Sequence, residues 1–218
     1  MNSYGVVIFD WDGTLVDSQA QIVRHMQTAF KQLGLEPPST YSIRQIIGLS
    51  IDIAIRQLYP DADNTLIKQI TDAYRNEYYA APHSEFQLFD GTLEMLDAIR
   101  EQSIYLAVAT GKSRRGLDHE LDQFGISNYF SITRCADETR SKPNPLMLQE
   151  ILIDLDLTID KALMVGDTSY DLDMANAIGM ASIAVTWGMH SSEQLLACNP
   201  AFIIDSFEQL KPLVSDIE

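Results

Sequence analysis

The stretch GVVIFDWDGTLVDS, from Gly5 to Ser18, places three aspartates directly after an apolar run. The run Val6–Phe9 has the composition of a strand that is buried on both faces of a parallel sheet. Residues i and i+2 of a strand point to the same side, so Asp10 and Asp12 would begin close together, where their negative charges repel. Two carboxylates at the end of a buried strand therefore indicate a bound cation.

Further apolar runs alternate with helical patterns along most of the chain. In residues 92–101, for example, Leu93, Leu96 and Ile99 are expected on one helix face. The predicted strands are Val6–Phe9, Ile104–Thr110, Tyr129–Thr133, Ala162–Val165, Ala181–Val185 and Phe202–Ile204. This alternation predicts an α/β fold with a doubly wound parallel sheet, whose ligands bind at the carboxyl ends of the strands.

The segment after the first strand has a different pattern. Strand candidates are absent between about Ser18 and His83, and apolar residues there recur at helical spacing. We therefore predict an all-α module, residues 17–85, inserted into an α/β core of residues 1–16 and 86–218. The hinges are expected near Leu15–Ser18 and Glu85–Asp90, with Asp17 and Ser18 beginning the first helix of this module.

Composition limits the classes of partner. The chain has 218 residues, a formal net charge of −16 and two cysteines. Such an acidic protein does not suit a nucleic acid or an anionic membrane surface, and no apolar run approaches the ~20 residues that span a bilayer. We expect a cytoplasmic protein, and an anionic substrate would need a local cation. The sequence does not indicate an oligomeric state.

Four polar clusters follow the first four predicted strands of the core: DWDGT, TGKS, SKPNP and GDTSYD. The topology would bring all four to one edge of the sheet. Asp167 and Asp171 of the fourth cluster add carboxylates to Asp10 and Asp12 of the first. Mg²⁺ suits such a site, because it takes a few carboxylates and keeps water and phosphate oxygens as its other ligands.

One lysine and one hydroxyl complete a set suited to phosphoryl transfer. Lys142 and Mg²⁺ would neutralise the phosphoryl oxygens, while Thr110 and backbone N–H groups, such as that of Gly111, add hydrogen bonds. One aspartate can attack as nucleophile, and a second can protonate the leaving alcohol and later deprotonate water. The four clusters therefore favour an enzyme that acts on a small phosphorylated metabolite.

The motifs DWDGTLVDS, TGKS, KPNP and GDTSYDLDMANAIG resemble those of the haloacid dehalogenase superfamily, in particular its phosphoglycolate phosphatase-like branch with a helical cap. The resemblance covers nearly the whole chain. It implies that Asp10 is the nucleophile and Asp12 the general acid/base, and that Thr110 and Lys142 hold the phosphoryl group. It implies a Mg²⁺ site at Asp10, the Asp12 carbonyl and Asp167, with Asp171 nearby or acting through water.

The implied activity is a Mg²⁺-dependent phosphatase that hydrolyses a phosphoglycolate-like ester, sugar phosphate or nucleotide through a phospho-aspartate. Asp12 counts against dehalogenation, since family dehalogenases lack this second aspartate. The TGK sequence replaces the commoner Thr-Asn pair, which leaves the leaving-group contacts open. The alternatives are a phosphomutase, a pyrophosphatase, a receiver-like phospho-acceptor and a regulatory protein on a degenerate phosphatase fold.

Several residues keep two interpretations. Thr168 or Ser169 could simply cap a helix, with Asp171 favourable in its first turn. The basic group of Lys112, Arg114 and Arg115 either attracts a substrate anion or lies in solvent at a helix start. In the cap, Arg44 and the IIGLS turn (46–50) are the candidates for substrate contact.

Overall fold

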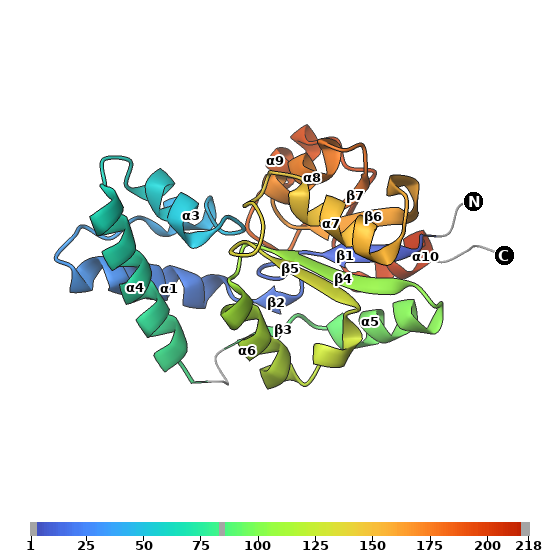
Figure 1. Cartoon of the computed structure of the whole chain (residues 1–218), viewed down its shortest axis with the longest axis horizontal. Helices are drawn as coiled ribbons and strands as arrows, with labels where there is room; N and C mark the ends of the chain where they lie inside the picture. Colours follow the sequence, from blue (N-terminus) through green and yellow to red (C-terminus); the bar gives the residue numbers. More distant parts are fainter. Residues whose placement is uncertain (1–3, 83–85, 215–218) are drawn as a thin grey trace.

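Six parallel strands form one sheet with β1 (Val6–Phe9) in its interior, in the order β5–β4–β1–β6–β7–β8 (Figure 1). The structure is a computed structural model that describes residues 4–82 and 86–214. The other strands are β4 (Tyr105–Thr110), β5 (Ile132–Cys135), β6 (Ala162–Gly166), β7 (Ala181–Val185) and β8 (Phe202–Ile204). The predicted doubly wound α/β sheet is confirmed.

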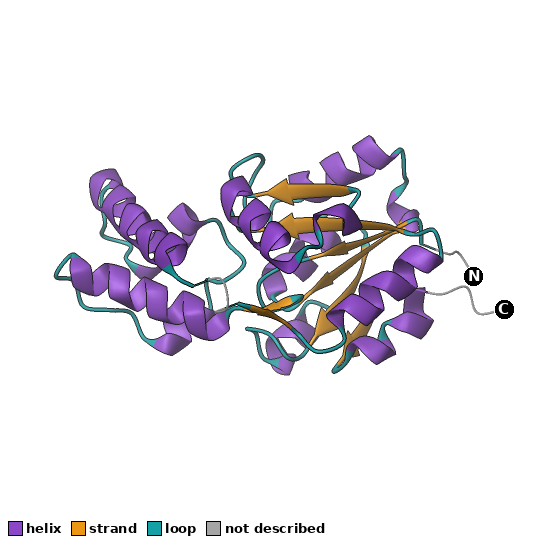
Figure 2. Cartoon of the chain, turned by 90° about the horizontal axis from the view of Figure 1, so that it is seen from below, coloured by secondary structure: helices purple, strands orange, loops and turns teal. Residues whose placement is uncertain are grey.

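Helices cover both faces of this sheet (Figure 2). They are α5 (Thr92–Glu101), α6 (Arg114–Phe124), α7 (Leu146–Leu155), α8 (Ser169–Asn176), α9 (Ser192–Ala197) and α10 (Lys211–Val214). Side chains of β1 alternate between two hydrophobic clusters: Val7 and Phe9 belong to one, Val6 and Ile8 to the other. Burial on both faces explains why the strand is an uninterrupted apolar run.

The register of the central strands aligns their carboxyl ends. Phe9 pairs with Val108 of β4 on one side and with Val165 of β6 on the other. Asp10 follows Phe9 directly, while Thr110 and Asp167 each lie two residues beyond the paired valines. Three of the predicted site residues therefore meet at one edge of the sheet.

A separate group of helices follows the first strand and lies at one end of the molecule (Figure 1). They are α1 (Gln19–Gln32), α2 (Thr40–Arg44), α3 (Ile51–Leu58) and α4 (Asn64–Ala80). Their apolar faces form a hydrophobic cluster that includes Met26, Phe30 and Ile70. We call these helices the cap. The boundaries 17–85 stay a prediction, and residues 83–85 lie outside the described part of the chain.

Two short strands connect the cap with the core. β2 (Val16–Asp17) pairs antiparallel with β3 (Gln87–Leu88). The prediction that Asp17 begins the first cap helix was wrong, because Asp17 lies in β2 and α1 starts after Ser18. Two-residue strands are too short to give a periodic pattern, so the sequence did not indicate this pair.

Two further details differ from the predictions. The strand expected at Tyr129–Thr133 begins only at Ile132, because residues 127–129 form a 3₁₀ turn. Leu93 was expected on the buried face of α5 but is 40% exposed, and the buried face carries Met95 in its place. Both differences concern where an element begins or which way it is rotated, and the sequence of elements is unaffected.

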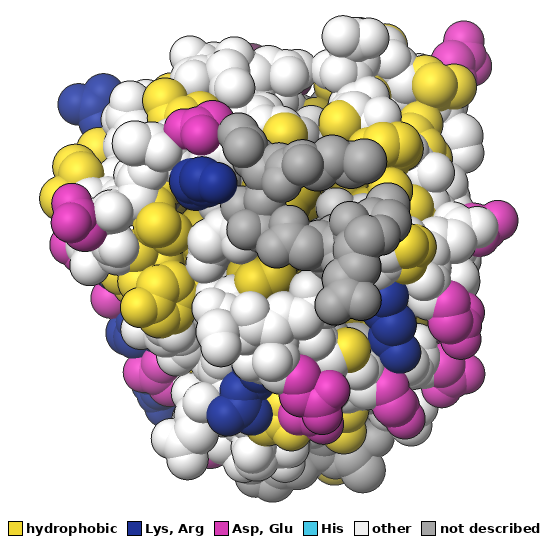
Figure 3. Space-filling model, turned by 90° about the vertical axis from the view of Figure 1, so that its right-hand side faces the viewer, with side chains coloured by type: hydrophobic (Ala, Val, Ile, Leu, Met, Phe, Trp, Pro, Cys, Tyr) yellow, Lys and Arg dark blue, Asp and Glu magenta, His cyan; other side chains and the backbone are white. Residues whose placement is uncertain are grey.

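The surface at the opposite end from the cap carries charges of both signs among hydrophobic side chains (Figure 3). The net charge of −16 is therefore not gathered into one acidic patch on this face. Among the described residues, no helix has the length and apolar character that crossing a membrane requires.

Candidate active site

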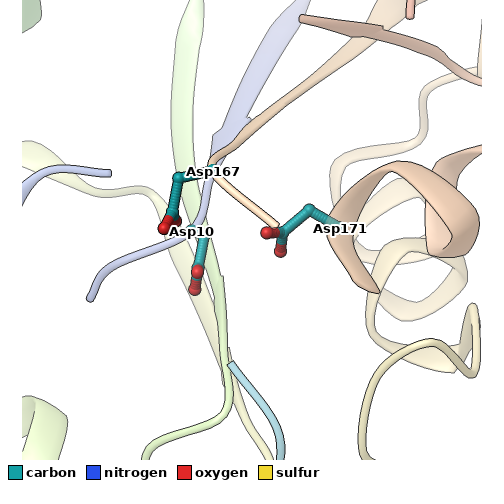
Figure 4. Close-up of side chains that lie close together, drawn as sticks. All are labelled: Asp10, Asp167 and Asp171. Carbon is teal, nitrogen blue, oxygen red and sulfur yellow. The ribbon is translucent and has the colours of Figure 1, made fainter. Parts of the chain in front are cut away.

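Three buried aspartates converge at the carboxyl edge of the sheet (Figure 4). Asp10 follows β1, Asp167 follows β6 and Asp171 lies in the first turn of α8. One oxygen from each carboxylate can be chosen so that all three lie within 4.8 Å of one another. Carboxylates at such separations repel strongly when water is excluded, so this cluster requires positive charge.

Lys142 supplies one positive charge. Its Nζ lies 2.6 Å from Asp10 Oδ1 and 2.6 Å from Asp171 Oδ1, and the lysine side chain is fully buried. Burial alone would lower the pKa of Lys142, but the two carboxylates raise it above its usual value. One ammonium faces three carboxylates, so the cluster remains short of positive charge.

The pKa values of the carboxyl groups reflect this shortage. Burial raises the pKa of Asp10 well above its usual value, Asp171 raises it further, and Lys142 opposes the shift. Burial and then Asp171 raise the pKa of Asp167 to about 7, although two hydrogen bonds oppose the change. Asp10 Oδ2 has no hydrogen-bond partner among the described residues. A buried, unpartnered carboxylate oxygen beside two more carboxylates fits a hard divalent cation.

Asp167 is fixed by neighbours from two loops. Thr14 Oγ1 donates a 2.8 Å hydrogen bond to Oδ1, and the Met189 N–H donates one of 2.8 Å to Oδ2. Gly13 makes this approach possible, because a Cβ there would lie 2.3 Å from Asp167 Oδ2 and its φ of +86° is in the left-handed region. The Gly-Thr turn of the first motif therefore orients a residue of the fourth.

Asp171 caps the start of α8 and also contacts Lys142, while its role near a metal ion stays a prediction. Its Oδ2 accepts hydrogen bonds from the Thr168 N–H, at 3.1 Å, and from Thr168 Oγ1, at 2.7 Å, as in a helix capping box. Its Oδ1 accepts from Lys142. Capping the helix thus holds Asp171 in place beside the lysine.

Asp12 is not among the three grouped carboxylates and has partners of its own. Ser18 Oγ donates a 2.7 Å hydrogen bond to Asp12 Oδ1, and Lys112 Nζ lies 3.1 Å from the same oxygen. Ser18 makes no side-chain hydrogen bond to the start of α1. The side chain of Asp12 is therefore outside the candidate metal cluster, and only its backbone carbonyl remains available to that role.

The second motif lies beside both groups. Thr110 is 1% exposed, and its Oγ1 accepts a 3.1 Å hydrogen bond from the Lys112 N–H. A Cβ at Gly111 would lie 2.4 Å from the carbonyl oxygen of Gly48 in the cap. The loop after β4 is therefore in direct contact with the IIGLS turn.

Glu120 is a buried site neighbour that the sequence reasoning missed. Its Oε1 lies 2.8 Å from Lys112 Nζ and accepts a 2.5 Å hydrogen bond from the Tyr78 hydroxyl, while Oε2 accepts one of 2.5 Å from Trp11 Nε1. Burial would lower the pKa of Lys112, but Asp12 and Glu120 raise it well above its usual value. One signal was available, since Glu120 falls on the face of α6 that carries Leu117 and Leu121.

The two arginines beside Lys112 have other partners. Arg114 pairs with Glu138 at 2.8 Å and with Asp118 at 3.0 Å. The guanidinium of Arg115 stacks on the Tyr79 ring at 4.1 Å. Of the basic group in the second motif, only Lys112 reaches the buried site.

The cap loop is bonded to the core at several points. Arg44 Nη2 donates to the carbonyls of Gly188, at 3.3 Å, and Met189, at 3.1 Å. The Ser50 N–H donates a 2.9 Å bond to Ser141 Oγ, next to Lys142. Arg44 thus contacts the loop that holds Asp167, and its contact with substrate stays a prediction.

Comparison with known proteins agrees with this geometry. The family model of the haloacid dehalogenase-like hydrolases matches residues 7–185, which places the chain in that family. The chain is 35% identical over 211 residues to "Probable phosphatase IndB" of Dickeya dadantii, covering 94% of this chain and 91% of the relative. It is 27% identical to a phosphoglycolate phosphatase of Pseudomonas putida, covering 97% of this chain and 80% of the relative.

A solved structure gives the same fold. The haloacid dehalogenase-like family hydrolase SP0104 of Streptococcus pneumoniae superposes with a TM-score of 0.85 at 25% identity, covering 99% of this chain and 100% of that chain. The predicted family and fold are confirmed, and the protein is a phosphatase of the haloacid dehalogenase-like hydrolases.

Proposed function

We propose that this phosphatase is Mg²⁺-dependent and hydrolyses a small-molecule phosphomonoester through a phospho-Asp10 intermediate. One observation carries the proposal: three buried carboxylates lie together, a single lysine contacts two of them, and an oxygen of Asp10 has no hydrogen-bond partner in the described part of the chain. One ammonium cannot neutralise three buried carboxylates that lie this close together. An excess of buried carboxylate fits a site that receives both a cation and a phosphoryl group.

The donor set suits Mg²⁺. The carboxylates of Asp10 and Asp167 and the Asp12 backbone carbonyl would hold the ion, with Asp171 as a further ligand directly or through water. The bound ion supplies positive charge that offsets the charge on the transferred phosphoryl oxygens.

Residues of the chain supply the nucleophile, the groups that hold the phosphoryl oxygens and the general acid/base. A carboxylate oxygen of Asp10 attacks phosphorus, and the bond between phosphorus and the leaving oxygen breaks. Lys142 and Thr110 hold the phosphoryl group, and the Gly111 N–H adds a hydrogen bond. Asp12 protonates the leaving oxygen, then takes a proton from the water that hydrolyses phospho-Asp10.

Phosphate release from a panel of phosphorylated metabolites, with Mg²⁺ and with EDTA, tests the proposal. We expect release with Mg²⁺ only, and an acid-quenched reaction should contain protein heavier by one phosphoryl group at the peptide with Asp10. Isomerised product without free phosphate would favour a phosphomutase. Stable stoichiometric phosphorylation would favour a phospho-acceptor, and cleavage of pyrophosphate alone would favour a pyrophosphatase.

The cytoplasm stays the expected location of the protein.

A further inference from the structure

A pocket with a cavity volume of about 100 Å³ lies between the cap and the loop after β4. Asp12 and Gly111 line its inner end, and the rest of its lining comes from cap helices α1, α3 and α4, the cap loop and the start of α6. Because Asp12 is the proposed proton donor to the leaving oxygen, the leaving group must extend into the space beside it. This pocket is therefore the leaving-group site of the proposed reaction.

Most of the cap's share of this wall is aliphatic. The aliphatic side chains on it include Ile22, Met26, Ile47, Leu49, Ile51 and Ala54. All of these except Ile51 are buried. Tyrosine rings of α4 add to the same wall, and the hydroxyl of Tyr78 is already bonded to Glu120. Burying the apolar surface of a ligand against such a wall stabilises the complex, whereas burying an unpartnered charge there destabilises it.

The cation at the inner end of the pocket already has partners. Lys112 Nζ lies within 3.1 Å of Asp12 and 2.8 Å of Glu120, and its side chain is only 9% exposed. It also lies 5.0 Å from the centre of the Tyr78 ring. A carboxylate entering beside Asp12 would compete with two buried carboxylates for one ammonium. Among the described residues that line the pocket, the other cation is Arg75, and it is exposed to solvent.

We infer that the substrate is a phosphate ester of an uncharged alcohol with an apolar, ring-sized body, which binds in this pocket. The inference rests on the proposed function and narrows its substrate class. It also separates this chain from relatives named for phosphoglycolate, whose leaving group is a small carboxylate.

Matched esters test the inference. Benzyl phosphate and 4-carboxybenzyl phosphate have the same reacting centre and differ in one charge at the far end of the ring. We expect kcat/KM for benzyl phosphate to exceed that for 4-carboxybenzyl phosphate, and that for phosphoglycolate, by at least about tenfold, since the buried cation on the described wall, Lys112, is already paired with two carboxylates. Equal or reversed values would overturn the inference.

A binding measurement separates failure of the inference from failure of the proposed function. If no ester releases phosphate, the proposed function fails, but calorimetry with the wild-type protein and Mg²⁺ still ranks non-hydrolysable phosphonates. Tighter binding of benzylphosphonate than of (4-carboxybenzyl)phosphonate and phosphonoacetate supports the apolar pocket. Equal or weaker binding of benzylphosphonate overturns it.

Two substitutions in α3 test whether the preference for the uncharged ester arises in this pocket. Ile51 lines the pocket, whereas Ile53 of the same helix does not and is 36% exposed. We expect Ile51→Arg to lower the preference for benzyl over 4-carboxybenzyl phosphate at least about tenfold, because it adds a cation to the wall. Ile53→Arg should leave the preference unchanged. Equal effects of the two variants would contradict the assignment of this pocket.

Arg75→Gln tests whether this arginine binds the carboxylate of a charged ester. We expect it to leave the preference for the uncharged ester unchanged, because the exposed guanidinium is well solvated. If the wild-type protein prefers the carboxylated esters and this variant loses the preference, Arg75 is their partner and the inference is overturned.

Discussion

Two lysines lie at the same edge of the sheet, each beside buried carboxylates. The two clusters differ in whether every carboxylate has a hydrogen-bond donor from the protein. The Lys142 cluster consists of Lys142 with Asp10, Asp167 and Asp171, and an Asp10 oxygen is left without a hydrogen bond. The Lys112 cluster consists of Lys112, Asp12 and Glu120 with the hydrogen-bond donors Trp11, Tyr78 and Ser18.

The difference distinguishes a site that is completed by ligands from one that is already complete. In the Lys112 cluster each carboxylate has donors from within the protein, which suits holding Asp12 in one orientation. In the Lys142 cluster three carboxylates share one ammonium, and an Asp10 oxygen has no hydrogen-bond donor among the described residues, which suits binding a cation and a phosphoryl group. Each prediction below perturbs one cluster and uses the other as its reference.

Asp10→Asn should have the largest effect on turnover. The amide has almost the same shape as the carboxylate but is a poor nucleophile, so we expect kcat to fall by at least about 10⁴-fold. Thermal stability without metal should not decrease, because one of the repelling buried charges is removed. Phosphate release and the melting temperature measure the two effects.

Asp17→Asn is the matched control, since Asp17 belongs to the same motif but is exposed in β2. We expect its turnover to stay within about twofold of the wild-type value, as is usual for a surface substitution. Normal turnover of Asp10→Asn would rule out the covalent mechanism.

Glu120→Gln should lower both activity and stability. Loss of its charge weakens the contacts with Lys112, Tyr78 and Trp11, and the amide nitrogen cannot accept from any of these donors, so we expect about 1–3 kcal/mol of destabilisation. Because Lys112 and Ser18 orient Asp12, we expect kcat to fall about 10- to 100-fold with little change in KM. Steady-state kinetics and denaturant unfolding measure these effects.

Glu138→Gln provides the comparison for Glu120→Gln. Glu138 also pairs with a cation, Arg114, but its side chain is 37% exposed. Such a surface pair contributes at most about 1 kcal/mol, and kcat should not change. A purely structural Glu120 would instead show the stability loss with an unaltered kcat.

The sequence located the Lys142 cluster because its members follow apolar strands. Asp10, Lys142 and Asp167 were each placed after a predicted strand, and the parallel register brings them together. Their roles in catalysis and metal binding stay predictions. Glu120 could not be assigned in the same way, since it lies within α6 and its partners Trp11 and Tyr78 come from distant segments. A polar residue on an apolar helix face identifies a buried group but not what it contacts.

Mg²⁺ should stabilise the protein through the Lys142 cluster alone. At a concentration about 100 times the dissociation constant, linkage gives about 2.7 kcal/mol, which corresponds to about 5–11 °C in melting temperature for a chain of this size. Asp167→Asn should abolish most of this shift, whereas Glu120→Gln should retain it. A shift that survives Asp167→Asn would place the cation elsewhere.

The smallest expected effect is the pH dependence of the free energy of unfolding of the metal-free protein. It is also the most direct measure of the excess negative charge in the Lys142 cluster. Asp167 has a pKa of about 7 in the folded protein against an ordinary value of 3.8, so between these values the folded state binds more protons than the unfolded state. The free energy of unfolding must then fall as pH rises through this window. With EDTA, raising the pH from 6 to 8 should cost about 1.4 kcal/mol, or about 3–6 °C, for a single group.

Mg²⁺ should reverse this trend, because the ion binds the ionised carboxylates and its stabilisation grows as protons leave. Asp167→Asn should flatten the slope seen in EDTA, while Glu138→Gln should leave it unchanged. If the metal-free protein instead became more stable between pH 6 and 8, Lys142 would already balance the carboxylates. The two clusters would then be equivalent, and the charge argument for a cation at Asp10 would fail.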